Sequence, residues 1–138
     1  YKRQEFGGPY TDIYTKTSKE SKKDERLKKS GKLICFTFFN EIFELNPATF
    51  FYDWLYINAL NKNENLHQFV LNYEAFTDIE FNPAKSWNCQ AYSVALYVSL
   101  YKNNLLKEAL KSKDNFKKIV KAEYDRKETI LQKQKSFL

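Results

Sequence analysis

An apolar run from residue 91 to residue 101 constrains the fold of this chain more than any other feature of its sequence. Much of the run is apolar on every side of a helix, a pattern typical of a helix buried at the centre of a protein. We therefore expect the other elements to pack around it. Its buried side, extended to residue 106, should consist of Ala91, Val94, Ala95, Val98, Leu105 and Leu106.

Two helices are predicted before this run and one after it. Asn46 should be the N-cap of the first helix, because its side chain can accept a hydrogen bond from the helix backbone. Pro47 should be its first helical residue, because a backbone N–H has no partner at that position and Pro lacks one. The second covers 64–74 and leaves His67 off its apolar face, hence exposed. The last is a basic amphipathic helix over 114–136. The expected apolar face of the first helix consists of Phe50, Phe51, Trp54, Leu55 and Ile57. That of the second consists of Leu66, Phe69, Val70 and Tyr73, and that of the last consists of Phe116, Ile119, Val120, Tyr124 and Leu131.

The first 45 residues carry turn and strand signals instead. Gly7-Gly8-Pro9 is a turn, since Gly permits positive φ and Pro fixes its own. The Lys-rich segment 15–32 predicts a mobile surface loop that ends in a helical turn closed by Gly31. The β-branched and aromatic residues of 33–45 predict a hairpin that turns at Phe39 and Asn40. The expected fold is α+β and predominantly helical, a single domain over 1–138 with a small β-hairpin.

Composition limits the class of protein. The chain has 138 residues, of which 43% are hydrophobic, enough to build a core and to exclude disorder. No apolar run is long enough to span a bilayer. Cys35, Cys89 and the single histidine are not at metal-ligand spacing, so we expect no metal, no cofactor, reduced thiols and a cytoplasmic location. The sequence starts at Tyr1 and contains no Met, so we also expect its N-terminal part to be missing.

Basic charge lies at the flanks of the sequence. Residues 16–32 hold eight basic against three acidic residues, and residues 111–135 hold nine against four. The middle, 33–110, has four basic against eight acidic residues. Basic flanks suit a polyanion such as nucleic acid. An ordinary solvated surface explains them equally well.

Polar side chains gather in residues 76–91, directly before the apolar run. Two carboxylates, Asp78 and Glu80, lie near three amides, Asn82, Asn88 and Gln90. Polar groups packed between apolar elements cost free energy unless each finds a partner. The stretch is either a loop that caps the next helix or part of a functional site, and both interpretations stay open on these residues alone.

Several motifs in this order resemble one family, the NADAR-domain antitoxins associated with DarT-type toxins. The resemblance spans about residues 1–106, and its most specific block is 76–91. The matching pieces are Lys2 followed by Gly7-Gly8-Pro9-Tyr10-Thr11-Asp12; Arg26-Leu27-Lys28 with Ser30-Gly31; Phe51-Tyr52-Asp53-Trp54-Leu55-Tyr56; and Phe76-Thr77-Asp78-Ile79-Glu80-Phe81-Asn82-Pro83 with Lys85-Ser86 and Asn88-Cys89-Gln90-Ala91.

The resemblance implies a YbiA-like fold and an activity. Proteins of this type are glycohydrolases that remove ADP-ribose from guanine bases of DNA, which reverses the action of the toxin. The implied partners are therefore ADP-ribosylated DNA and a DarT-type toxin, with no membrane and no metal. The family's glutamate before the catalytic lysine would precede the first residue of this sequence.

The implied catalytic residues are Lys2, Asp78 and Glu80. An amine such as that of Lys2 can attack the anomeric carbon of ribose and form a Schiff base. A carboxylate can stabilise the positive charge that develops on the sugar or transfer a proton to the leaving base. Asp78 is the first choice for that role and Glu80 the second. The alternatives are a surface lysine for Lys2 and a cap or ion pair for Glu80.

The implied substrate-binding residues have structural alternatives as well. Glycine backbone can approach a pyrophosphate, Trp54 can stack on a purine, and the amides can bind ribose or the base edge. Trp54 could equally pack in the core, and Asn88 and Gln90 could cap the helix that follows. A non-catalytic module that binds ADP-ribose or sequesters the toxin, and a basic nucleic-acid-binding domain, remain alternative functions. The substrate-binding candidates are Gly7, Gly8, Tyr10, Trp54, Asn82, Asn88 and Gln90.

Overall fold

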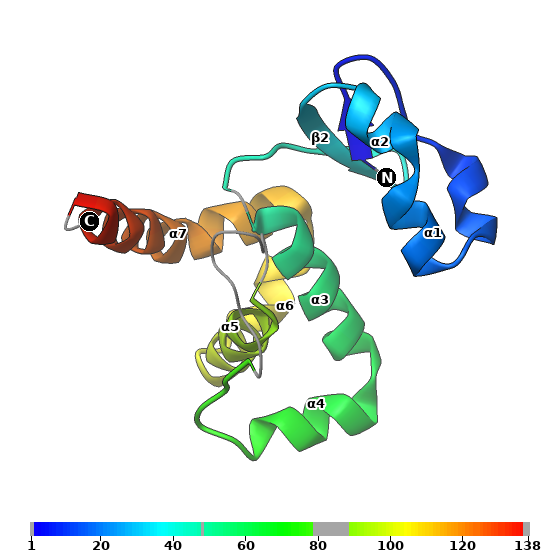
Figure 1. Cartoon of the computed structure of the whole chain (residues 1–138). Helices are drawn as coiled ribbons and strands as arrows, with labels where there is room; N and C mark the ends of the chain where they lie inside the picture. Colours follow the sequence, from blue (N-terminus) through cyan, green and yellow to red (C-terminus); the bar gives the residue numbers. More distant parts are fainter. Residues whose placement is uncertain (1, 48, 79–88, 137–138) are drawn as a thin grey trace. The chain divides into compact units, whose positions relative to one another are not determined.

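The computed structural model describes residues 2–47, 49–78 and 89–136. It divides into two units, Tyr1–Phe51 and Tyr52–Leu138, which are described separately (Figure 1). Unit 1 holds a small sheet and short helices, and unit 2 is helical throughout its described part. The α+β, predominantly helical class predicted from the sequence is confirmed.

A three-stranded antiparallel sheet forms the centre of unit 1, in the order β1-β2-β3. Its strands are β1 (Lys2–Gln4), β2 (Leu33–Phe38) and β3 (Glu41–Phe43). The predicted turn is confirmed, since Phe39 and Asn40 link β2 to β3 with φ of 45° and 63°, as a two-residue hairpin turn requires. Strand β1 was not predicted, because three residues are too few to show a period.

Most of the Lys-rich segment is helical, so the expectation of a loop was wrong, whereas the helical turn predicted before Gly31 is present. A 3₁₀ helix η1 (Thr11–Thr15) leads into α1 (Ser18–Lys23) and α2 (Glu25–Lys29). Thr17 forms a capping box with Glu20 at the start of α1, and the Asp24 carboxylate accepts from the backbone at the start of α2. These caps stabilise helices too short to hold by themselves. Gly31 follows α2 with φ of 77°, as predicted for a closing glycine.

Helix α3 (Phe50–Lys62) begins three residues later than predicted. The Pro47 carbonyl instead accepts the Phe50 amide at 3.0 Å in a turn that precedes the helix. Four phenylalanine rings then form the core of unit 1, with the rings of Phe36 and Phe51 stacked 4.4 Å apart. The sheet and the first turn of α3 share this core, whose rings are Phe36, Phe43, Phe50 and Phe51.

Helix α5 (Gln90–Lys102) supplies much of the core of unit 2, as the apolar run predicted. The predicted buried side is only partly right: Val98 and Leu106 are buried, whereas Ala95 and Leu105 are exposed. A run that is apolar all round does not specify which side faces inward. The buried residues of α5 are Ser93, Leu96, Tyr97, Val98 and Leu100.

The remaining helices of unit 2 are α4 (Glu64–Leu71), α6 (Leu106–Ala109) and α7 (Lys113–Ser136). The prediction for α7 is confirmed, with Phe116, Val120 and Tyr124 buried. None of the helices in the described ranges combines the length and apolarity that crossing a membrane requires.

The predicted buried face of α4 is confirmed only at Val70. Leu66, Phe69 and Tyr73 are 47%, 57% and 46% exposed, and Val70 is the buried residue. His67, predicted to be exposed, is half-buried, and its Nδ1 lies 2.5 Å from the hydroxyl of Tyr97 on α5. The helix therefore contacts α5 through His67, and the aromatic side chains of Phe69 and Tyr73, which the periodicity assigned to the core, are exposed.

Candidate functional site

Asp78 lies at the N-terminus of α5, where both of its carboxylate oxygens accept hydrogen bonds. The amide of Ala91 donates to Oδ1 at 3.1 Å. The thiol of Cys89 donates to Oδ2 at 2.7 Å, and its Sγ also accepts from the Tyr92 amide at 3.4 Å. Cys89 is thus the N-cap of α5. These two donors hold the carboxylate in a fixed position at the start of the helix.

Of the other polar candidates in this stretch, only Gln90 belongs to the described residues. Glu80, Asn82 and Asn88 lie outside the described residues. Gln90 is the first residue of α5 and is exposed. The predicted capping of α5 is real, but the described side chains at that end are those of Asp78 and Cys89, not of an amide. Sequence reasoning did not identify Cys89, since a thiol is an uncommon cap.

A second carboxylate is fully buried in unit 2. Asp53 on α3 is 0% exposed. Its Oδ1 accepts from the Ser93 hydroxyl of α5 at 2.6 Å, and its Oδ2 accepts from the Tyr124 hydroxyl of α7 at 3.0 Å. Burial, reinforced by the negative charge of Asp53, raises the pKa of Tyr124 well above its usual range. The three side chains tie α3, α5 and α7 together, which is a structural role that the sequence did not reveal.

Lys2 and the glycine turn lie together in unit 1. Lys2 is exposed on β1. Gly8 has φ of 88°, and a Cβ built there would come within 2.8 Å of the Lys2 carbonyl oxygen. The turn therefore returns against β1, and only glycine allows that approach. Packing of the turn against β1 therefore accounts for the glycine at position 8 without a ligand, and the approach of this backbone to a pyrophosphate stays a prediction.

Tyr10 connects this turn to α2. Its hydroxyl lies 2.5 Å from Oγ of Ser30, and the Arg26 guanidinium lies 4.6 Å from the ring centre. Arg26 also binds the carboxylates of Asp12 and Asp24. Hydrogen bonding to Arg26, with a further contribution from Lys16, holds the pKa of Asp24 well below its usual range. The motif residues of this part of the chain therefore fix the conformation of residues 10–30.

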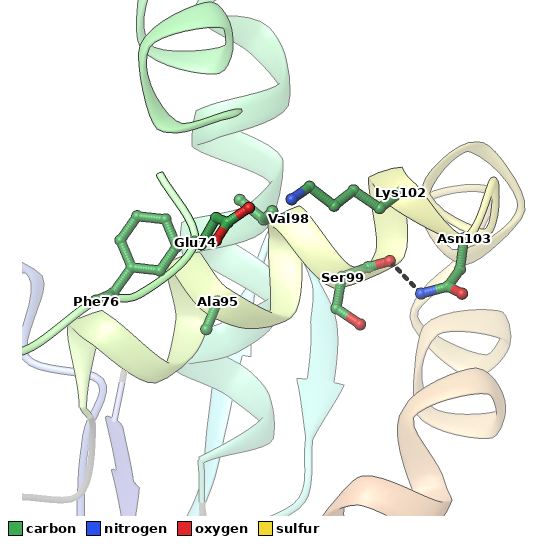
Figure 2. A pocket seen from close by; sticks show the side chains of 7 residues that line it. All are labelled: Glu74, Phe76, Ala95, Val98, Ser99, Lys102 and Asn103. Atoms are coloured by element: carbon green, nitrogen blue, oxygen red, sulfur yellow. Dashed lines mark hydrogen bonds between the residues drawn. The ribbon is translucent and has the colours of Figure 1, made fainter. Parts of the chain in front are cut away.

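A pocket of about 330 Å³ opens on the surface of unit 2 (Figure 2). Ala95 and Val98 of α5 form its apolar part, and the ring of Phe76 stands opposite them. Glu74, Ser99, Lys102 and Asn103 supply polar groups around it. Among the described residues no hydrogen bond or ion pair engages the side-chain charges of Glu74 or Lys102. The pocket is as large as a small-ligand site, and sequence reasoning did not identify it.

Comparison with protein families places these features in context. A family model described as the DarT1-associated NADAR antitoxin matches residues 2–130. The chain belongs to this family. The resemblance read from the sequence motifs is thereby confirmed. A search of curated proteins gives no significant match.

The family match identifies the protein as an antitoxin, and its description points to a DarT1 toxin as the partner. It covers both units, including β1 with Lys2 and the segment with Asp78. Trp54, a candidate for base stacking, packs edge-to-face on Phe116 at 5.5 Å, so core packing explains at least part of its presence. Within the described ranges no cluster of three or more His, Cys, Asp or Glu side chains could hold a metal ion.

Proposed function

We propose that this antitoxin is a glycohydrolase that removes ADP-ribose from guanine bases of DNA. Membership of the DarT1-associated NADAR family supports the biological role. The observation that carries the chemistry is the Asp78 carboxylate, held by two donors at the start of α5. Cleavage of an N-glycosidic bond develops positive charge on the ribose, and a carboxylate fixed in advance stabilises that charge without reorganisation.

Lys2 is proposed as the nucleophile. Its Nζ attacks the anomeric carbon of the ribose, the guanine nitrogen leaves with the electron pair of the glycosidic bond, and the proton that the amine loses is taken up by the guanine. Opening of the sugar ring gives a Schiff base between Lys2 and the ribose. Water then hydrolyses the Schiff base to ADP-ribose and the free amine. Exposure of Lys2 on β1 leaves its amine accessible to a substrate.

The test uses a single-stranded oligonucleotide with one ADP-ribosylated guanine. Chromatography should detect released ADP-ribose and the unmodified oligonucleotide. Asp78→Asn keeps the shape and an acceptor for the Ala91 amide but removes the charge, so it should slow release by about 100-fold or more. Asp114→Asn, which neutralises an exposed carboxylate in the first turn of α7, is the matched control and should keep full activity.

Three results separate this proposal from its rivals. Borohydride should trap a covalent adduct on Lys2, and its absence from an active enzyme would exclude the Schiff base. Binding of free ADP-ribose without any release would indicate a non-catalytic binding module. Salt-sensitive DNA binding with neither property would indicate a basic DNA-binding domain.

A further inference from the structure

Three aromatic rings, two exposed and one half-buried, run in a row from the end of α4 towards Asp78. The rings of Phe69 and Tyr73 are 5.1 Å apart, and those of Tyr73 and Phe76 are 6.4 Å apart. Phe69, on α4, and Tyr73, just after it, are about half exposed, although residues four apart in a helix often form a buried stripe. Large apolar side chains gathered on a surface mark a binding site more often than singly exposed ones do.

The row ends in the pocket of Figure 2, because Phe76 belongs to both. The same pocket is lined by groups of opposite charge, the Glu74 carboxylate and the Lys102 ammonium, and by the Ser99 hydroxyl. These groups match the parts of a nucleotide: a base can stack on the aromatic ring, a phosphate can bind the ammonium, and a base edge can form hydrogen bonds with the polar groups. Among the described residues Lys102 forms no ion pair, so its ammonium can bind an anion.

We propose that this row and pocket, consisting of Phe69, Tyr73, Glu74, Phe76 and Lys102, bind unpaired nucleotides of the DNA strand that carries the modified guanine. The inference rests on the proposed function for the identity of the substrate. Successive bases stack on the rings, Lys102 binds a phosphate, and Glu74 accepts a hydrogen bond from a base N–H group. Duplex DNA hides the faces of its bases, so the surface selects single strands.

The position of the row fits this role. Phe76 lies two residues before Asp78, and the helix that carries Lys102 and Ser99 at one end holds Asp78 at the other. All of these residues belong to unit 2. A strand bound along the row is therefore led towards the carboxylate proposed to act on the modified nucleotide.

Fluorescence anisotropy with an unmodified, labelled 12-nucleotide strand tests the binding surface without any turnover. The single strand should bind more tightly than the duplex of the same sequence. Tyr73→Ala and Phe76→Ala should each weaken binding by about tenfold, and Lys102→Gln should weaken it and reduce its salt dependence. Phe39→Ala, which removes an 84% exposed ring on the hairpin of unit 1, and Lys118→Gln on α7 are the matched controls. Both should leave binding unchanged.

Equal binding by the row variants and the wild type, or tighter binding of the duplex, would overturn the inference. Loss of binding to purified DarT1 toxin by the row variants, with DNA binding intact, would assign the surface to a protein instead. Thermal melting of the variants checks that they fold. If an aromatic variant does not fold, Lys102→Gln still tests the inference, because it changes only an exposed side chain.

Turnover distinguishes failure of this inference from failure of the proposed function. With a modified oligonucleotide, Tyr73→Ala should raise KM about tenfold and leave kcat unchanged, because stacking away from the reacting bond binds substrate and transition state equally. With ADP-ribosylated guanosine alone, the variant should match the wild type. A wild type that binds single strands through the row but releases no ADP-ribose would refute the proposed function and leave the binding surface standing. If the row variants release ADP-ribose from both substrates as fast as the wild type, the inference is refuted and the proposed function stands.

Discussion

Tyr124→Phe tests whether the buried Asp53 carboxylate holds unit 2 together. The change removes one oxygen atom, and with it the 3.0 Å hydrogen bond to Asp53. Tyr124 is 3% exposed and Asp53 is 0% exposed, so water cannot replace the lost donor. A hydrogen bond to a charged group contributes about 1.5–3 kcal/mol, and an under-satisfied buried acceptor adds to the loss. We expect the free energy of unfolding to fall by about 2–3 kcal/mol.

Urea denaturation followed by circular dichroism measures the change, and a fall in Tm of roughly 6–15 °C should accompany it. Tyr101→Phe is the matched control, because it deletes the same atom from a side chain of α5 that is 44% exposed. Its effect should stay within about 0.5 kcal/mol. A loss for Tyr124→Phe no larger than that of the control would refute the argument that this hydrogen bond is energetically important.

A double-mutant cycle gives a second check on the same network. Asp53→Asn removes the negative charge to which the Tyr124 hydroxyl donates its hydrogen bond. After that substitution, removing the hydroxyl should cost clearly less than it does in the wild type, because directly interacting residues are not additive. Additive losses would show that the two side chains stabilise unit 2 independently of each other.

Three further outcomes are expected. Cys89→Ala removes the thiol donor to Asp78 and should lower kcat on the order of tenfold, because the carboxylate is then misplaced. Cys89→Ser keeps a donor and should retain most of the wild-type kcat. Equal rates for both variants would exclude a positioning role for Cys89. Gly8→Ala should destabilise unit 1 by about 1–2 kcal/mol or more, because its φ of 88° is left-handed and the new Cβ would meet the backbone of β1 at 2.8 Å; an unchanged Tm would contradict this. Burial raises the pKa of Tyr92 to about 12 and that of Tyr124 further. The folded state therefore retains these protons above the unfolded pKa of about 10, so the free energy of unfolding should fall as the pH rises past 10. Urea titrations at successive pH values measure the slope of the free energy of unfolding against pH, which should be shallower in Tyr124→Phe.

Local signals in the sequence were sufficient for several elements. The Phe39-Asn40 turn, the apolar run of α5 and the amphipathic pattern of α7 each predicted the element that the structure contains. These signals depend on neighbouring residues, whose spacing is fixed by the geometry of a strand or a helix. The same is true of Gly31 after α2. The motifs also identified the family, which the match over residues 2–130 confirms.

Signals that depend on competing local preferences were less reliable. Lysines dominate residues 15–32, but capping by Thr17 and Asp24 makes two short helices there. Asn46 and Pro47 have the composition of a helix start, yet α3 begins at Phe50, where the rings of unit 1 pack. In each case a hydrogen bond or a packing contact outweighed the average preference of the residues involved.

The sequence by itself therefore determined the class of fold, the order of its main helices and the family, because these follow from periodicity and motif spacing along the chain. Tertiary structure decided which sides of α4 and α5 face inward, and it alone brought Asp53, Ser93 and Tyr124 together from three helices. It also placed the Cys89 thiol on Asp78 and left Phe69 and Tyr73 of the aromatic row exposed. Contacts between residues distant in sequence depend on how elements rotate and pack against one another, and no pattern within a single element specifies that rotation.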